Sequence, residues 1–171
     1  VYVTLYNKWG SMPFSNISSA EERHLKAVIT LLKNYGSADT LIGDVGKFTS
    51  SEVQKLYNDL IIKGSISVEQ AFRVGAWIED LDIHDLTDFI TRISNQDIKQ
   101  VFENLRRGSH NHLRAFNRQL TSLGVVYTPE YISQSEFDQI VSLGTEQGQS
   151  CKNQNNKKCC GKGKCKGFGQ K

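Results

Sequence analysis

The stretch "SSAEERHLKAVITLLKNYG", residues 18–36, decides the fold class, because it contains a helix start, a periodic apolar run and a stop. Ser18 and Glu21 fit a capping box, in which each side chain satisfies a backbone N–H group at the start of a helix. Gly36 follows as a typical stop. Between them, apolar residues recur at helical spacing at Leu25, Val28, Ile29, Leu31 and Leu32. The stretch therefore predicts an amphipathic helix that begins near residue 19.

The same start signals recur along the chain. They predict a short helix over residues 50–63 and longer helices that begin near residues 67 and 95, the last closed by Gly124. A further short helix is predicted over residues 133–143. The capping residues behind these predictions are Thr49 with Glu52, Ser67 with Gln70, Asn95, and Ser133 with Glu136. No alternating pattern typical of a strand is found, so the sequence predicts an all-α fold.

Four amphipathic helices must bury their apolar stripes against one another, and a four-helix bundle is the simplest arrangement that does so. The first is "VYVTLYNKWG", residues 1–10, which resembles the second half of a helix whose first half lies upstream. The others begin near residues 19, 67 and 95. The short helix at residues 50–63 then belongs to a long crossover. Without an initial methionine or a signal segment, the chain is interpreted as truncated or processed, which leaves its compartment open.

The sequence divides into a body, residues 1–143, and a basic tail, residues 144–171. The tail has seven lysines and one glutamate, a net charge of +6, whereas the whole chain carries +3, so the body carries about −3. Six glycines and no branched aliphatic residue make the tail unable to form a core, so we expect it to be flexible. No apolar run approaches the roughly 20 residues of a membrane-spanning helix.

All four cysteines, Cys151, Cys159, Cys160 and Cys165, lie in the tail. Adjacent thiols beside lysines suit a soft metal or redox chemistry, since nearby positive charge favours the thiolate. Their spacing fits no standard zinc or iron–sulfur pattern, and a tail whose thiols have no metal is an equal alternative. Nucleic-acid binding is disfavoured because the tail contains only one aromatic residue, Phe168.

Glu21 and His24 are three residues apart, so on a helix both side chains leave the same face one turn apart and can reach one ion. Helical bundles bind metal pairs with carboxylates and Glu-x-x-His motifs on facing helices. The alternative is that Glu21 only caps its helix and His24 lies on a polar face. Further candidate ligands are Glu79 and Asp82, again three apart, and His112, near an apolar edge. Their alternatives are a solvated acidic face and a hydrogen-bonded core histidine; His84 and His110 are expected to be exposed.

Six stretches follow one another from the start to about residue 143: "LYNKWG", "FSNISSAEERHLKAVITLLKNYG", "KLYNDLIIKGSIS", "AFRVGAWIEDLDIHDL", "VFENLRRGSHNHLRAFNRQL" and "GVVYTPEYISQSEFDQIV". Together they resemble the ferritin-like family known as domain of unknown function 2202. The resemblance implies a ferritin-like four-helix bundle with a buried metal site that binds iron, and no established reaction.

Residue by residue, the resemblance implies that Glu21 and His24 are the second-helix Glu-x-x-His, that Glu79 and Asp82 are the acidic third-helix pair and that His112 is the fourth-helix histidine. Ser109 stands where a second Glu-x-x-His motif would have its glutamate, and Asp82 could supply that carboxylate. The first-helix glutamate of the family lies upstream of Val1.

Three hypotheses for function remain open. The first is a di-iron or manganese protein, a ferroxidase or peroxidase-type oxidoreductase that handles oxygen, peroxide or ferrous iron. The second is a structural or interaction protein on a ferritin-like scaffold, which could assemble as a homo-oligomer. The third is a carrier that binds a soft metal through the cysteine tail.

Overall fold

The computed structural model describes residues 1–37, 44–144 and 146, and within them six α-helices and no strand. The prediction of an all-α fold is therefore confirmed. The helices are α1 (Tyr2–Trp9), α2 (Met12–Asn34), α3 (Ser51–Gly64), α4 (Val68–Arg92), α5 (Gln96–Ser122) and α6 (Gln134–Ser142).

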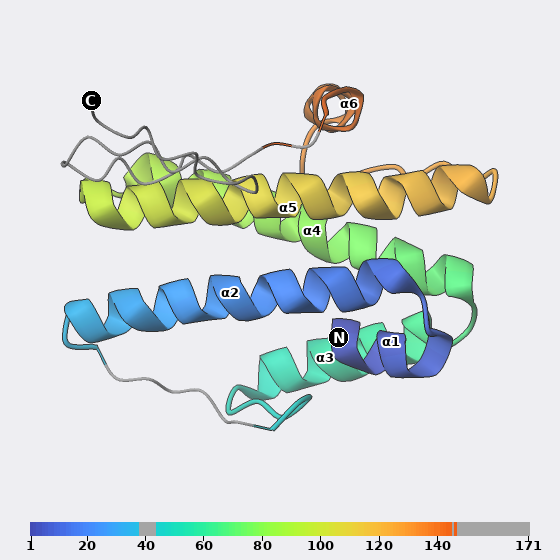
Figure 1. The fold of residues 1–171 in the computed structure, drawn as a ribbon, viewed down its shortest axis with the longest axis horizontal. Helices are drawn as coiled ribbons and strands as arrows, with labels where there is room; N and C mark the ends of the chain where they lie inside the picture. The colour runs from blue at the N-terminus through green and yellow to red at the C-terminus, as the bar shows by residue number, and fades with distance from the viewer. Residues whose placement is uncertain (38–43, 145, 147–171) are drawn as a thin grey trace, which may run out of the picture.

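Two antiparallel hairpins form the body of the molecule (Figure 1). The first joins α1 to α2 through a tight turn at Gly10, which adopts a positive φ of 63°. The second joins α4 to α5, the most extensively packed pair of helices, and α2 lies against α5. Helix α3 lies beside α1 and leads into α4, while the short α6 packs on α5. This arrangement turns one face each of α2, α4 and α5 toward a common interior.

Three of the predicted helix starts are confirmed by side-chain caps. Ser67 accepts a hydrogen bond from the backbone N–H of Gln70, and Ser133 accepts one from that of Glu136. Asn95 accepts from the N–H groups of two residues in the first turn of α5. The predicted stops also hold, since Gly36 and Gly124 follow α2 and α5 with φ values of 67° and 70°.

Two predicted starts are wrong. Helix α2 begins at Met12, with Ser11 as its N-cap and a proline in its first turn, so Ser18 lies inside the helix. The Ser18 hydroxyl donates to the carbonyl of Ser15 and caps nothing. The start of α3 is displaced by one residue, because Ser50 and not Thr49 accepts from the N–H of Val53. The helix before Glu21 is thus longer than predicted, and Glu21 is free to act as a mid-helix side chain.

An aromatic cluster forms the centre of the core where α1, α2, α4 and α5 meet. Phe14 and Phe116 are fully buried, with ring centroids 5.4 Å apart, and Tyr2 packs on Phe116 at 5.6 Å. Phe14 also stacks on Phe72 at 5.6 Å. This cluster adjoins the polar site described below and separates it from the end of the molecule that holds the α1–α2 turn.

The predictions for the cysteine tail concern Cys151, Cys159, Cys160 and Cys165, which lie outside the described residues. Among the described residues, no helix is both long enough and apolar enough to cross a membrane.

Candidate metal centre

Three of the five predicted ligands converge in the interior, one from each of three helices. Glu21 on α2, Glu79 on α4 and His112 on α5 each place a ligand atom within 4.8 Å of the other two. Glu79 is fully buried and His112 is 7% exposed. Since these residues are up to 91 positions apart in the chain, only the packing of the helices brings them together.

The converging atoms lack the hydrogen bonds that buried polar groups normally make. Oε1 of Glu21, Oε2 of Glu79 and Nδ1 of His112 are buried and make no well-directed hydrogen bond to any described residue. Nδ1 of His112 lies 2.9 Å from Oε1 of Glu21, but the two atoms are not aligned for a hydrogen bond. Each of the three side chains thus has a buried polar atom without a well-directed hydrogen bond, which is costly unless another group satisfies it.

Glu21 faces a different imidazole with each of its oxygens. Oε1 lies 2.9 Å from Nδ1 of His112, and Oε2 lies 3.1 Å from Nδ1 of His24. The two imidazole rings are 5.6 Å apart between centroids. His24 is therefore brought to the same carboxylate as His112, from one turn further along α2.

Tyr2 is a site residue that the sequence analysis missed. Its hydroxyl donates a hydrogen bond to Oε1 of Glu79, and its ring is buried against Phe116. This bond satisfies one oxygen of Glu79 and leaves Oε2 without a partner. Nothing in the sequence near Tyr2 indicates this contact, because the two residues are 77 positions apart.

The pKa values show how strongly the groups interact. Burial raises the pKa of Glu21, but the close imidazoles of His112 and His24 outweigh it and lower the pKa to about 2. Burial lowers the pKa of His112, yet Glu21 and Glu79 outweigh it and raise the pKa to about 10. Without a metal, a protonated His112 therefore neutralises part of the carboxylate charge at pH 7.

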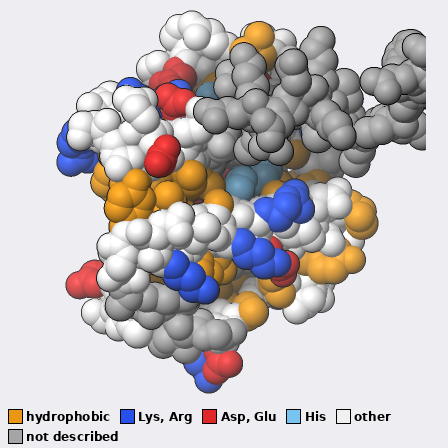
Figure 2. Space-filling view, turned by 60° about the vertical axis from the view of Figure 1, so that its left-hand side comes forward, with side chains coloured by type: hydrophobic (Ala, Val, Ile, Leu, Met, Phe, Trp, Pro, Cys, Tyr) orange, Lys and Arg blue, Asp and Glu red, His pale blue; other side chains and the backbone are white. Residues whose placement is uncertain are grey.

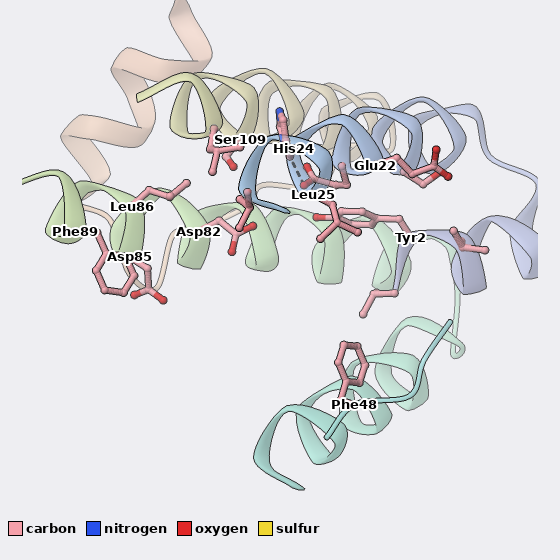
Figure 3. Close-up of a pocket in the computed structure, with 16 residues that line it drawn as sticks. Tyr2, Glu22, His24, Leu25, Phe48, Asp82, Asp85, Leu86, Phe89 and Ser109 are labelled. Atoms are coloured by element: carbon pink, nitrogen blue, oxygen red, sulfur yellow. Dashed lines mark hydrogen bonds and ion pairs between the residues drawn. The ribbon is translucent and has the colours of Figure 1, made fainter. Parts of the chain in front are cut away.

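Asp82, one turn after Glu79 on α4, lies at the edge of the cluster rather than within the group of three. It lines a pocket of about 660 Å³ together with Glu21, His24 and Ser109. In Figure 3 the labelled side chains of Tyr2, His24, Asp82 and Ser109 lie around this pocket. Burial, with repulsion from Glu79 and Glu21, raises the pKa of Asp82 to about 8.

The pocket provides a path from solvent to the cluster. Most of its wall is apolar and is built by residues that include Val28, Leu86, Phe89 and Leu105. In the space-filling view, histidine side chains lie recessed in a hollow bordered by apolar side chains and by lysine or arginine (Figure 2). Three of the predicted ligands, Glu21, His24 and Asp82, thus line an accessible opening.

The donor set fits a metal ion. Ligand atoms about 2.0–2.2 Å from one tetrahedral ion lie about 3.4 Å from each other. Nδ1 of His112 lies 3.4 Å from Oε1 of Glu79, which matches this spacing, and 2.9 Å from Oε1 of Glu21, which is shorter. Imidazole nitrogens suit iron and carboxylate oxygens suit manganese, and the cluster contains no thiolate, the ligand that soft metals prefer.

The other two histidines differ from each other. His84 is exposed, as predicted, and lies 3.1 Å from Asp85. The prediction that His110 is exposed is wrong, because its side chain is 18% exposed and its Nδ1 lies 3.0 Å from Glu146. Glu146 also accepts from the buried Arg114, while Asn111 bonds to both the N–H and the carbonyl of Glu146. This contact fastens Glu146 to α5, on a face separate from the ligand cluster.

Fold and site together define an all-helical protein with a buried cluster of carboxylates and histidine. Comparison of the sequence with protein families identifies it further, since residues 1–144 match the model described as an uncharacterized protein domain, DUF2202. The chain belongs to this family.

A relative with a solved structure supports the fold. The uncharacterized protein MJ0754 of Methanocaldococcus jannaschii is 47% identical over 151 residues, which cover 88% of this chain and 82% of the relative. The crystal structure titled as hypothetical protein MJ0754 matches with a TM-score of 0.83 at 46% identity, over 85% of this chain and 83% of the other. Neither name states a function.

Proposed function

We propose that this chain is a ferritin-like metalloprotein that holds iron or manganese between α2, α4 and α5. The observation that carries the proposal is that Glu21, Glu79 and His112 bring ligand atoms within 4.8 Å of one another in the interior, and that each has a buried polar atom without a hydrogen-bond partner. A bound cation would satisfy all three and offset the cost of burying two carboxylates side by side.

The arrangement around Glu21 favours two ions over one. Each oxygen of Glu21 lies beside a different imidazole nitrogen, so the donors around this carboxylate would be enough to serve two metal ions. Glu21, Glu79 and His112 would hold the metal, and His24 with Asp82 would complete the donor set. Ser109, which lines the same pocket, offers only a hydroxyl on the α5 side.

Bound iron or manganese would supply redox chemistry between the +2 and +3 states, as in the oxidation of ferrous iron or the reduction of peroxide. The protein's own part is to hold the ligands and to handle protons. His112 must lose its proton to become a ligand, and so must Asp82, whose pKa of about 8 keeps it largely neutral at pH 7. Metal uptake should therefore release protons and weaken as the pH falls.

Metal analysis of the purified full chain tests the proposal. The parent protein, loaded anaerobically with Fe²⁺ or Mn²⁺, should retain about two equivalents after gel filtration. Glu79→Gln and His112→Gln should lose at least one equivalent while circular dichroism remains helical. Glu22→Gln and His84→Gln are matched controls, because both side chains are exposed and lie beside or near the same helix segments.

The outcome against the proposal is a parent chain that retains neither metal, or control variants that lose as much metal as the ligand variants. A protein that retains only zinc, copper or nickel, and loses it when residues 151–171 are removed, would instead favour a soft-metal carrier. Unaltered metal content in His24→Ala would remove His24 from the ligand set.

A further inference from the structure

Gly108 occupies an unfavourable position for glycine, in the interior of the 27-residue helix α5. Glycine disfavours helices relative to alanine because it loses more backbone freedom on folding. Its φ is not positive, so the backbone conformation at this position does not require glycine. The reason for glycine must lie in what packs against it.

The neighbour is the imidazole of His24 on α2. A Cβ atom at position 108 would lie 2.3 Å from Cε1 and 2.6 Å from Nε2 of His24. Real carbon contacts of this kind lie beyond 3.0 Å, so any side chain here must displace the ring. The imidazole is rigid, and its Nδ1, which is bonded to Cε1 and lies 3.6 Å from the same Cβ position, contacts Oε2 of Glu21 at 3.1 Å. A displaced ring would lose that contact.

We infer that Gly108 is a positioning residue for His24: the absence of a side chain on α5 lets the imidazole lie against the helix with Nδ1 turned to Glu21. The inference rests on the proposed function, in which His24 is a ligand. It adds a residue outside the ligand set that decides whether the ligand reaches its place. The same contact sets the distance between α2 and α5 at the site.

Gly75 on α4 provides a matched comparison. A Cβ atom there would lie 2.4 Å from Cζ of Phe116, a fully buried core residue. Both glycines thus admit a ring from another helix, but one ring belongs to the core and the other to the site. Alanine at position 75 should disturb packing, whereas alanine at position 108 should disturb His24.

The test compares the substitution Gly108→Ala in two backgrounds of the full chain. With His24 present and metal removed, the substitution should lower Tm and shift the imidazole NMR signals of His24. In the His24→Ala background the space is open and alanine favours the helix, so the same substitution should raise Tm. This reversal of sign does not depend on activity or on metal.

Metal binding provides the second measurement. Fe²⁺ or Mn²⁺ affinity should fall 10–100-fold in Gly108→Ala, as for other residues that orient ligands. Gly75→Ala, measured below its Tm, should keep the affinity of the parent protein. The inference is wrong if the parent binds metal and Gly108→Ala binds it with the same affinity. It is also wrong if Gly108→Ala, with His24 present, has unshifted His24 signals and a Tm above that of the parent. A parent that binds no metal overturns the proposed function and, with it, the ligand role assigned to His24.

Discussion

The hydroxyl of Tyr2 donates a hydrogen bond to Oε1 of Glu79, which joins α1 to the buried carboxylate of α4. Both side chains are almost completely removed from solvent, with exposed fractions of 8% and 0%. The bond engages the same oxygen that lies 3.4 Å from Nδ1 of His112 and leaves Oε2 of Glu79 without a partner, so Tyr2 helps to orient the carboxylate. Burial, together with the charge of Glu79, keeps the pKa of Tyr2 well above its ordinary value, and the phenol remains a donor.

Tyr2→Phe should destabilise the protein by about 1–3 kcal/mol, because it leaves a second oxygen of Glu79 buried without a partner. It should also weaken metal binding about 10–100-fold, since the orientation of Glu79 is lost. Urea unfolding and metal titration measure the two effects. Tyr6→Phe, which removes a hydroxyl outside the cluster, is the control; equal losses in both variants would contradict a specific role for Tyr2.

Asp82 should make the stability of the metal-free protein depend on pH. Its pKa is raised from 3.8 to about 8, so the folded state binds this proton more tightly than the unfolded state does. The resulting stability is fully present below pH 3.8 and is lost as pH rises toward 8. Asp82→Asn cannot ionise and so does not lose this stability. As the pH rises, its free energy of unfolding should therefore increase relative to that of the parent protein, by at most about 1.4 kcal/mol per pH unit.

Urea unfolding between pH 5 and pH 8 in the presence of a chelator checks this prediction. The exposed neighbour Asp85, which lines the same pocket, provides the control variant Asp85→Asn. When metal is added, the parent protein should become more stable than Asp82→Asn, because the variant lacks the carboxylate proposed as a ligand. An advantage of Asp82→Asn that is constant across this pH range would contradict the raised pKa.

Asp80 should act on stability alone, although it adjoins Glu79 in the sequence. Its carboxylate is fully buried and accepts hydrogen bonds from the Tyr127 hydroxyl and from the backbone N–H groups of Glu130, Tyr131 and Ile132. It thereby fastens the segment between α5 and α6 to α4. Asp80→Asn should cost about 2–4 kcal/mol of unfolding free energy, because hydrogen bonds to a charged acceptor are weakened or lost.

The metal content of folded Asp80→Asn should equal that of the parent protein, whereas Glu79→Gln should lose metal. Measuring both variants by urea unfolding and by metal analysis separates the two adjacent carboxylates. Loss of metal from Asp80→Asn under conditions in which the variant is fully folded would place Asp80 in the metal site and contradict a role in stability alone.

Glu146 should belong to the folded unit even though it lies beyond residue 143, the expected end of the body. Arg114 is 3% exposed and uses Nη2 to bond Glu146. Glu146→Ala should therefore cost about 1–3 kcal/mol, since a buried cation loses an acceptor. A chain truncated after Ser150 keeps Glu146 and should unfold at the same urea midpoint as the full chain. A lower midpoint for the truncated chain would show that residues 151–171 support the fold.

The local features of this protein follow from sequence alone where the physical cause spans one or two helical turns. The helical class, the stops at Gly36 and Gly124, and the caps at Ser67, Asn95 and Ser133 all depend on neighbours within a few residues. The pairing of Glu21 with His24 is of the same kind, because the i, i+3 spacing puts both on one helix face. The predicted start of α2 is wrong because Ser18 is of a residue type that commonly caps helices. The actual start signal, Ser11 followed by Pro13, lies upstream.

Tertiary structure decided which polar residues meet. Glu79, Asp80 and Asp82 are equivalent carboxylates in the sequence, yet packing turns the first to His112, the second to the Tyr127–Ile132 segment and the third to the edge of the pocket. Likewise, no local pattern joins Tyr2 to Glu79 or Gly108 to His24, since these contacts depend on the distance and rotation between helices. Helix periodicity specifies which face of each helix is buried, but only the close packing of all of them specifies which buried side chains touch.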